Sequence, residues 1–264
     1  MSRAVVAWRT LKFDLKNNSK LQTDVEIASE SMYDLYVNGK LYVTVVLSPT
    51  QIKEWTIGFL YSEGLIDSVR RLKRVNINDD SIEVKTIETD TFEKRSLQIG
   101  RYLPDSCAST ISMRRISFIK KISNEIFSNT LIVPKDMVKR ISVLLNKASK
   151  TYRITGGTHS AALFNDEGKI CFFSEDVGRH NAVDKVIGAS LLNNIRLDDK
   201  ILAVSGRLSG DLVFKCARAR IPILISLSAP LSRGVELAEM AGITLIGFAR
   251  GNRFNIYAHP QRIQ

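Results

Sequence analysis

The first third of the chain carries the alternation of apolar and polar residues that is typical of strands. The pattern predicts strands over most of residues 11–47, with a hairpin turn at Asn38-Gly39 because both turn positions accept positive φ. The same alternation in residues 72–99 predicts further strands. Between these regions we expect a helix that starts after Ser48-Pro49-Thr50 and stops at Gly64. Its apolar residues at helical spacing are Ile52, Trp55, Phe59 and Leu60.

The rest of the chain alternates between helical and strand-like periods. Two helices are predicted within residues 112–149, with a break near 129–134. Two strands then flank a turn at 165–168. The elements predicted after them are helix 181–194, strand 201–204, helix 209–220, strand 223–227, helix 231–241 and strands 244–247 and 253–257. This order predicts a layered α/β domain with parallel strand pairs, whose ligands usually bind at the edge where the loops after successive strands meet.

The change in pattern predicts two domains. The first, residues 1–130, is a smaller strand-rich α+β domain that ends in a loop around Cys107 and a helix. The second, residues 131–264, is the α/β domain, to which we assign ligand binding.

Composition narrows the classes of protein. The 264 residues are 44% hydrophobic and 25% charged, as in ordinary globular proteins. No stretch without Lys, Arg, Asp or Glu exceeds twelve residues, which is too short for a membrane helix, so no membrane partner is expected. A net charge of +11 favours polyanionic partners: nucleic acid, nucleotides or a phosphate-rich cofactor. Three widely spaced cysteines cannot form a disulfide framework, which indicates a reducing compartment, the cytoplasm.

Cys107 is the cysteine with the strongest chemical signal. Small and polar residues surround it, and Arg101, Arg114 and Arg115 are near in sequence, which favours the reactive thiolate. It is either an accessible nucleophile or an incidental loop cysteine. Cys171 lies in a predicted strand and Cys216 in a predicted helix, so both are expected to be small core residues.

Three loops of the α/β domain have residues that suit an anion. Gly206 and Arg207 lie between a strand and a helix start, and Ser228 lies after the next strand. The third loop, residues 248–253, contains two arginines that can fork to phosphate oxygens, although a basic hairpin turn is the alternative.

Glu175-Asp176 and Arg179-His180 lie at the start of a predicted helix, and the sequence favours two interpretations of them equally. These residues orient a substrate or move a proton, or they form a helix cap with surface ion pairs. The pair Gly156-Gly157 fits neither a GxGxxG nor a Walker A pattern. The spacing of cysteine and histidine matches no zinc motif, so no metal site is expected.

Taken together, the motifs resemble the formate dehydrogenase accessory protein family, FdhD, a family of sulfurtransferases. The resemblance spans about residues 33–263, and the order and spacing of its motifs are specific. The segments that carry it are residues 58–66 (GFLYSEGLI), 155–164 (TGGTHSAALF), 175–185 (EDVGRHNAVDK), 205–207 (SGR), 228–230 (SAP) and 247–257.

The resemblance implies a function that the residues alone do not show. Members of this family pass sulfur from a cysteine desulfurase to the molybdenum or tungsten bis(molybdopterin guanine dinucleotide) cofactor before its insertion into formate dehydrogenase. It also implies a C-terminal domain similar to the cytidine-deaminase fold without its zinc, a homodimer, and Cys107 as the persulfide-bearing residue. The corresponding cofactor-binding segment is Phe248, Ala249, Arg250, Gly251, Asn252 and Arg253.

The loop motifs extend this expected site. Gly206, Arg207, Ser228 and His180 are expected to hold the phosphates and guanine ends of the cofactor. A nucleic-acid partner is then not expected, because the cofactor accounts for the basic charge.

One position departs from the family pattern. Many members carry two cysteines as CxxC in the loop, and here the second position is Thr110. An internal disulfide is therefore not expected, whereas one thiolate suffices to accept and hand on sulfur. The departure motivates a second hypothesis, a cofactor-binding chaperone without sulfur transfer. A third, a nucleotide hydrolase or deaminase, lacks a metal motif or an evident nucleophile–base pair.

Overall fold

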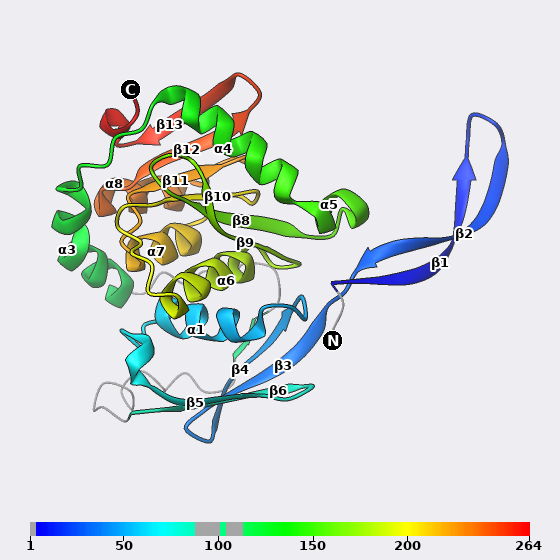
Figure 1. Ribbon diagram of the computed structural model, residues 1–264, viewed down its shortest axis with the longest axis horizontal. Coiled ribbons are helices and arrows are strands. Elements are labelled where there is room, and N and C mark those ends of the chain that lie inside the picture. The colour runs from blue at the N-terminus through cyan, green and yellow to red at the C-terminus, as the bar shows by residue number, and fades with distance from the viewer. Residues whose placement is uncertain (1–3, 88–100, 104–112) are drawn as a thin grey trace.

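The computed structural model describes residues 4–87, 101–103 and 113–264 (Figure 1). Within these ranges the chain forms two layered sheets with helices between and around them, and a separate two-stranded ribbon. Cys107 and Thr110 lie outside the described residues. The mixed α/β class that the sequence predicts is confirmed.

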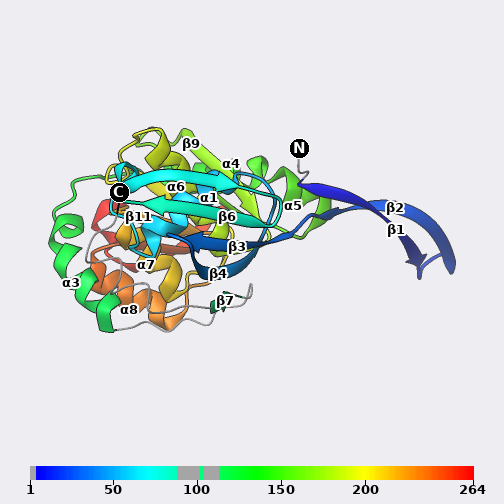
Figure 2. The ribbon, with the colours of Figure 1, turned by 90° about the horizontal axis from the view of Figure 1, so that it is seen from below.

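The N-terminal ribbon, which we call the arm, is a long antiparallel hairpin. It consists of β1 (Val5–Asp14) and β2 (Ser19–Ala28). Figures 1 and 2 both show it extending away from the rest of the molecule.

The smaller sheet has the order β5-β6-β3-β4-β7. Its strands are β3 (Ser31–Val37), β4 (Lys40–Leu47), β5 (Leu72–Ile77), β6 (Ser81–Thr86) and β7 (Arg101–Leu103). The 3-10 helix η1 (Val69–Arg71) precedes β5. The predicted hairpin is confirmed: Asn38 and Gly39 have φ of 51° and 81°, the two positive values that this tight turn requires.

Helix α1 (Ile52–Ser62) lies between the two sheets. Its Trp55 stacks on Phe59 with ring centroids 5.0 Å apart, and both belong to the core of the smaller sheet. Gly64 follows with φ of 75°, so the predicted helix and its stop are confirmed. The other side of α1 packs against α6 (Arg179–Leu192). There a Cβ on Gly58 would lie 1.8 Å from the carbonyl oxygen of Asp184, so only glycine allows this approach.

The larger sheet has the order β13-β12-β11-β10-β8-β9. Its strands are β8 (His159–Phe164), β9 (Ile170–Asp176), β10 (Ile201–Val204), β11 (Ile223–Ser226), β12 (Thr244–Arg250) and β13 (Arg253–Ala258). The three central strands, β10 to β12, are parallel, as the pattern predicts, and the flanking strands are antiparallel.

Helices cover both faces of this sheet. The face with Leu202 and Val204 packs against four helices, α3 (Met113–Phe127), α6, α7 (Gly210–Arg218) and α8 (Ser232–Ala241). The face with Ile201 and Ala203 packs against α4 (Lys135–Ala148). The short elements α5 (Lys150–Thr155) and η2 (Pro260–Arg262) complete the described fold.

The proposed division near residue 130 stays a prediction. Helix α3 lies before that boundary and packs against α7 and α8 of the later part of the chain.

Candidate functional site

One edge of the larger sheet brings together most of the described residues that the sequence nominates. Strands β10, β11 and β12 are parallel, so their carboxyl ends share this edge. Strand β9 also ends there, because both β9 and β10 are antiparallel to β8. Helices α6, α7 and α8 begin directly after β9, β10 and β11. Three helix N-termini therefore lie along one edge, where the helix dipoles favour an anion.

Backbone and serine hydrogen bonds join the three predicted loops at this edge. The Ser226 hydroxyl donates to the carbonyl oxygen of Gly206 at 2.6 Å. The N–H of Leu208 donates to the carbonyl oxygen of Ala229, and the N–H of Phe248 donates to that of Ser228, both at 3.0 Å. The predicted convergence of the loops after β10 and β11 is confirmed, and residues 248–253 join them.

Helix α6 is held against the start of α7. His180 Nε2 lies 3.1 Å from the Ser209 hydroxyl, directly before the first residue of α7. A Cβ on Gly206 would lie 2.9 Å from the Cβ of Arg179, so glycine allows the Arg179 side chain to lie over this loop. The start of α6, with His180, therefore lies beside the loop that contains Gly206, as a shared site requires.

His159, which is not among the predicted site residues, also lies at this edge. Its Nδ1 is 3.3 Å from the Ser205 hydroxyl, which in turn accepts the N–H of Ser160 at 2.9 Å. His159 reaches the edge because β8 starts where its antiparallel neighbour β10 ends. In the sequence, His159 lies within residues 155–164, a segment that carries the family resemblance, but this position does not specify a partner.

Residues 248–253 form the end of β12, a turn and the start of β13. Phe248 is 41% exposed and has φ of 52°, a strained backbone conformation for a bulky residue. Arg250 is exposed, and its Nε donates to the carbonyl oxygen of Leu227 at 2.5 Å. Ala249 is buried in the core, so its methyl group is not available to a ligand. The exposed residues of the segment, besides Phe248 and Arg250, are Gly251, Asn252 and Arg253.

Of the two interpretations of Glu175-Asp176, the contacts of these carboxylates favour the structural one. The Glu175 carboxylate accepts the N–H groups of Thr151 and Tyr152 at 2.9 and 2.8 Å, in the first turn of α5. Asp176 is fully buried and pairs with Lys185. Both carboxylates are therefore committed to a helix end and to a buried ion pair.

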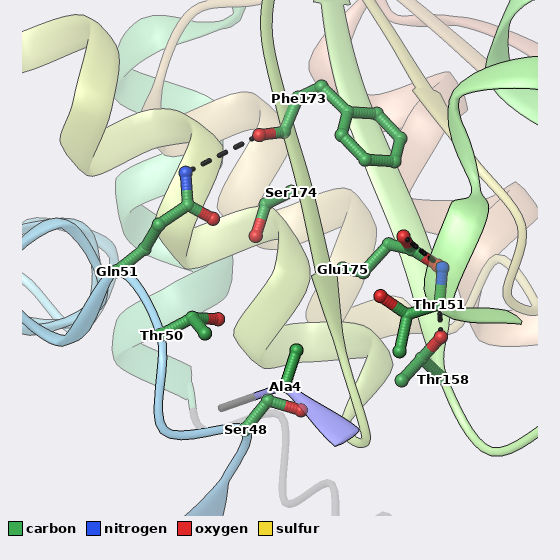
Figure 3. Close-up of a pocket in the computed structure, with 9 residues that line it drawn as sticks. All are labelled: Ala4, Ser48, Thr50, Gln51, Thr151, Thr158, Phe173, Ser174 and Glu175. Atoms are coloured by element: carbon green, nitrogen blue, oxygen red, sulfur yellow. Dashed lines mark hydrogen bonds between the residues drawn. The ribbon is translucent and has the colours of Figure 1, made fainter. Parts of the chain in front are cut away.

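A small polar pocket adjoins Glu175 (Figure 3). It has a volume of about 150 Å³, and the Ser174 hydroxyl points into it beside Thr50 and Gln51. At about 30 Å³ per water molecule, this volume holds only a few waters. The pocket is thus too small for a dinucleotide, and the open sheet edge is the candidate site for a ligand of that size.

Two of the three cysteines can be placed. Cys216 is fully buried, and burial raises the pKa of its thiol far above the ordinary value. Cys171 is half-buried in β9, and burial raises the pKa of this thiol as well. Both thiols are therefore poor nucleophiles at neutral pH. The predicted core position is confirmed for Cys216, whereas Cys171 is only partly buried against the core.

Neither a metal cluster nor a membrane span is found among the described residues. No group of three or more His, Cys, Asp and Glu side chains there could hold a metal ion. None of the helices in these ranges is long and apolar enough to cross a membrane.

The fold and this edge define a class of protein: a mixed α/β protein whose helix N-termini and arginines suit an anionic ligand. The model of the FdhD/NarQ family matches residues 28–264. The chain belongs to this family.

Relatives are similar in sequence to this chain over nearly its whole length. The protein named Sulfur carrier protein FdhD from Sulfurisphaera tokodaii is 36% identical over 259 residues, which cover 97% of this chain and 98% of the relative. The protein of the same name from Bacillus subtilis is 35% identical over 90% of each chain. The crystal structure of a Desulfotalea psychrophila protein, assigned as a formate dehydrogenase accessory protein, is similar with a TM-score of 0.79. It is 25% identical and covers 99% of this chain and 100% of its own.

Proposed function

We propose that this protein is a sulfur carrier in the maturation of formate dehydrogenase. In this proposal Cys107 receives sulfur from a cysteine desulfurase as a persulfide. The protein then acts as a sulfurtransferase toward the molybdenum or tungsten bis(molybdopterin guanine dinucleotide) cofactor, which the protein binds as a substrate. Relatives at 33–38% identity carry the name Sulfur carrier protein FdhD, and this name supports the role of a sulfur carrier.

The observation that carries the substrate proposal is the convergence of three loops and three helix N-termini at one sheet edge. A dinucleotide cofactor has several phosphates, and helix N-termini bind phosphates well. Arg207, Arg250 and Arg253 are exposed there and can add forked hydrogen bonds. The exposed ring of Phe248 offers a flat apolar surface for a guanine base.

The proposed chemistry needs one thiolate. The Cys107 thiolate attacks the outer sulfur of the desulfurase persulfide, a new S–S bond forms, and the donor cysteine leaves as a thiolate. In the second step the outer sulfur passes to the metal, the S–S bond breaks, and Cys107 is again a thiolate. A sulfane sulfur is formally neutral and a sulfide ligand is dianionic, so the metal centre supplies the electron pair.

The other parts of the proposal concern place and partners. Formate dehydrogenase is the recipient of the sulfurated cofactor, and the chain acts as a homodimer in the cytoplasm, where Cys107 stays reduced. We also propose that the domain built on the larger sheet resembles the cytidine-deaminase fold without its zinc.

Mass spectrometry of the intact protein and its peptides tests sulfur transfer. After incubation with a cysteine desulfurase and cysteine, we expect a gain of one sulfur atom on Cys107 that a reductant removes. Cys107→Ser should abolish this gain but still bind the cofactor. An unmodified Cys107, with the desulfurase active on another acceptor, would contradict the proposal.

Thr110 favours one alternative, a chaperone that binds the cofactor without transferring sulfur. This alternative keeps the sheet-edge site and removes the role of Cys107. Cys107→Ala separates the two functions, because a chaperone variant would support formate dehydrogenase normally and a sulfur carrier variant would not.

A further inference from the structure

The arm formed by β1 and β2 leaves many apolar side chains uncovered. Trp8 is 64% exposed and Leu15, at the tip, is 93% exposed. The other large apolar residues of the arm that are more than a third exposed are Val6, Leu11, Phe13, Leu21, Val25 and Ile27. An isolated two-stranded ribbon is only marginally stable in water, and a large exposed apolar patch marks an interaction surface.

The strand register divides the arm into two different faces. Val6 is opposite Ile27 and Trp8 is opposite Val25, so these four side chains share one face. Leu21 lies on the same face, because it is opposite Lys12 and side chains alternate along each strand. We call these five residues the arm face. The reverse face carries the ion pair between Arg9 and Asp24, at 3.1 Å, together with Leu11 opposite Gln22 and Phe13 opposite Lys20.

We propose that the arm face binds the arm face of a second copy of this chain, with the two arms antiparallel. The inference rests on the proposed homodimer and is independent of the sulfur chemistry. In this arrangement the same residues meet on both sides, so the contact is self-complementary and closed, as in twofold dimers. The tip of each arm then lies beside the base of the other.

Charge favours a second copy as the occupant. Each chain carries a net charge of +11, so two copies repel one another over most of their surfaces. Residues 5–28 contain four basic side chains (Arg9, Lys12, Lys16, Lys20) and three acidic ones (Asp14, Asp24, Glu26), a net charge of +1. The arm is therefore a nearly neutral and apolar part of a strongly basic protein, where two like copies can approach.

The size of the arm shows what else the contact needs. Ten-residue strands are about 33 Å long, and a two-stranded ribbon is about 10 Å wide. Two such faces laid together remove roughly 700 Å² from water, whereas specific interfaces begin at about 1,200 Å². The arm faces alone are too small, so the contacts between tip and base must contribute.

Helix α5 offers an apolar surface at the base of the arm. It packs beside β2, and its Tyr152 and Ile154 are 49% and 57% exposed. In the antiparallel arrangement the partner's tip, with the turn residue Leu15, would reach these two side chains. Both the middle of the arm and α5 should therefore affect dimer stability.

Sedimentation equilibrium of the full chain tests the proposal with three single-lysine variants. We expect the wild type to be a dimer at about 100 µM, a concentration well above the Kd of a specific interface. Trp8→Lys and Ile154→Lys should each raise the dimer Kd about tenfold or more. Leu11→Lys adds the same charge on the reverse face at a site that is 50% exposed, and should change the Kd by less than about threefold. Circular dichroism of each variant checks that it folds.

Tryptophan fluorescence gives a second measurement. Trp55 is fully buried, so a change in acrylamide quenching with protein concentration reports Trp8. We expect Trp8 to become protected as the dimer forms.

The possible failures are distinguishable. A monomeric wild type at this concentration would contradict the homodimer itself and leave the arm to a different partner. A dimer that Trp8→Lys does not weaken, or that Leu11→Lys weakens equally, would overturn the arm-face assignment alone.

Discussion

Lys185 Nζ lies 2.5 Å from Asp176 Oδ2, and neither side chain is exposed to solvent. The same ammonium donates to the carbonyl oxygen of Ser48 at 3.0 Å, and Asp176 accepts the N–H of Ser48 at 3.1 Å. Burial raises the pKa of Asp176 and lowers the pKa of Lys185, so each group depends on the other to stay charged. This cluster ties the loop before α1 to helix α6 and thus joins the two sheets.

We expect removal of either partner of this pair to destabilise the protein strongly. Asp176→Asn and Lys185→Met should each cost about 3–5 kcal/mol, because each leaves one buried charge unpaired. The double variant should cost clearly less than the sum of the two. Chemical denaturation measures the three free energies of unfolding, and simple additivity would contradict the pairing. Lys169→Met in the exposed pair with Glu167 is the control and should have no measurable effect.

The crossing of α1 and α6 makes a second prediction. Gly58→Ala should destabilise the protein by about 2 kcal/mol or more, because the new Cβ meets the Asp184 carbonyl oxygen and the helices must separate. This result is opposite to the stabilisation that alanine usually gives in a helix. Lys53→Ala, on the exposed side of α1, should stay within about 0.5 kcal/mol of the wild type. Thermal or chemical unfolding of both variants measures their free energies of unfolding relative to the wild type.

Binding at the sheet edge can be tested with guanosine diphosphate as a probe. Arg207→Ala should weaken binding about tenfold or more, because it removes an exposed cation beside the N-terminus of α7. Arg196→Ala removes another exposed arginine, which pairs with Asp198 beyond the C-terminus of α6, and should leave binding unchanged. Calorimetry or fluorescence titration gives the two Kd values. Equal effects of the two variants would mean general electrostatic attraction and no defined site.

The raised thiol pKa values of Cys171 and Cys216 predict slow alkylation. Thiolate is the reactive form, so a raised pKa moves the increase in rate to higher pH than for a free cysteine. Near about pH 8, both residues should react several-fold more slowly in the native protein than in the denatured protein. Peptide mass spectrometry after brief iodoacetamide treatment measures each site. Rapid native labelling of Cys171 would contradict its burial and would make it a rival for the persulfide.

Much of the larger sheet follows from local pattern. The apolar run Ile201–Val204, bounded by turn residues, predicts a buried strand, and β10 lies there with alternate side chains on both faces. Asn38-Gly39 predicts its hairpin for an equally local reason, since few residue pairs accept two positive φ values. The parallel order of the strands then brings the loops at Gly206 and Ser228 to one edge.

Other features depend on residues that are distant in sequence. No local pattern pairs His159 with Ser205, because their contact arises from the antiparallel pairing of β8 and β10. The glutamate in Glu175-Asp176 could equally have been catalytic, and only its contact with the first turn of α5 decides otherwise.

The sequence by itself determined the elements, the α/β class and the family motifs, because short-range periodicity and turn chemistry act within a few residues. Only the tertiary structure decided how close α1 and α6 approach at Gly58, which buried charges meet, and that the arm leaves Trp8 uncovered. These features depend on long-range packing, in which a side chain's surroundings come from segments that sequence spacing does not relate.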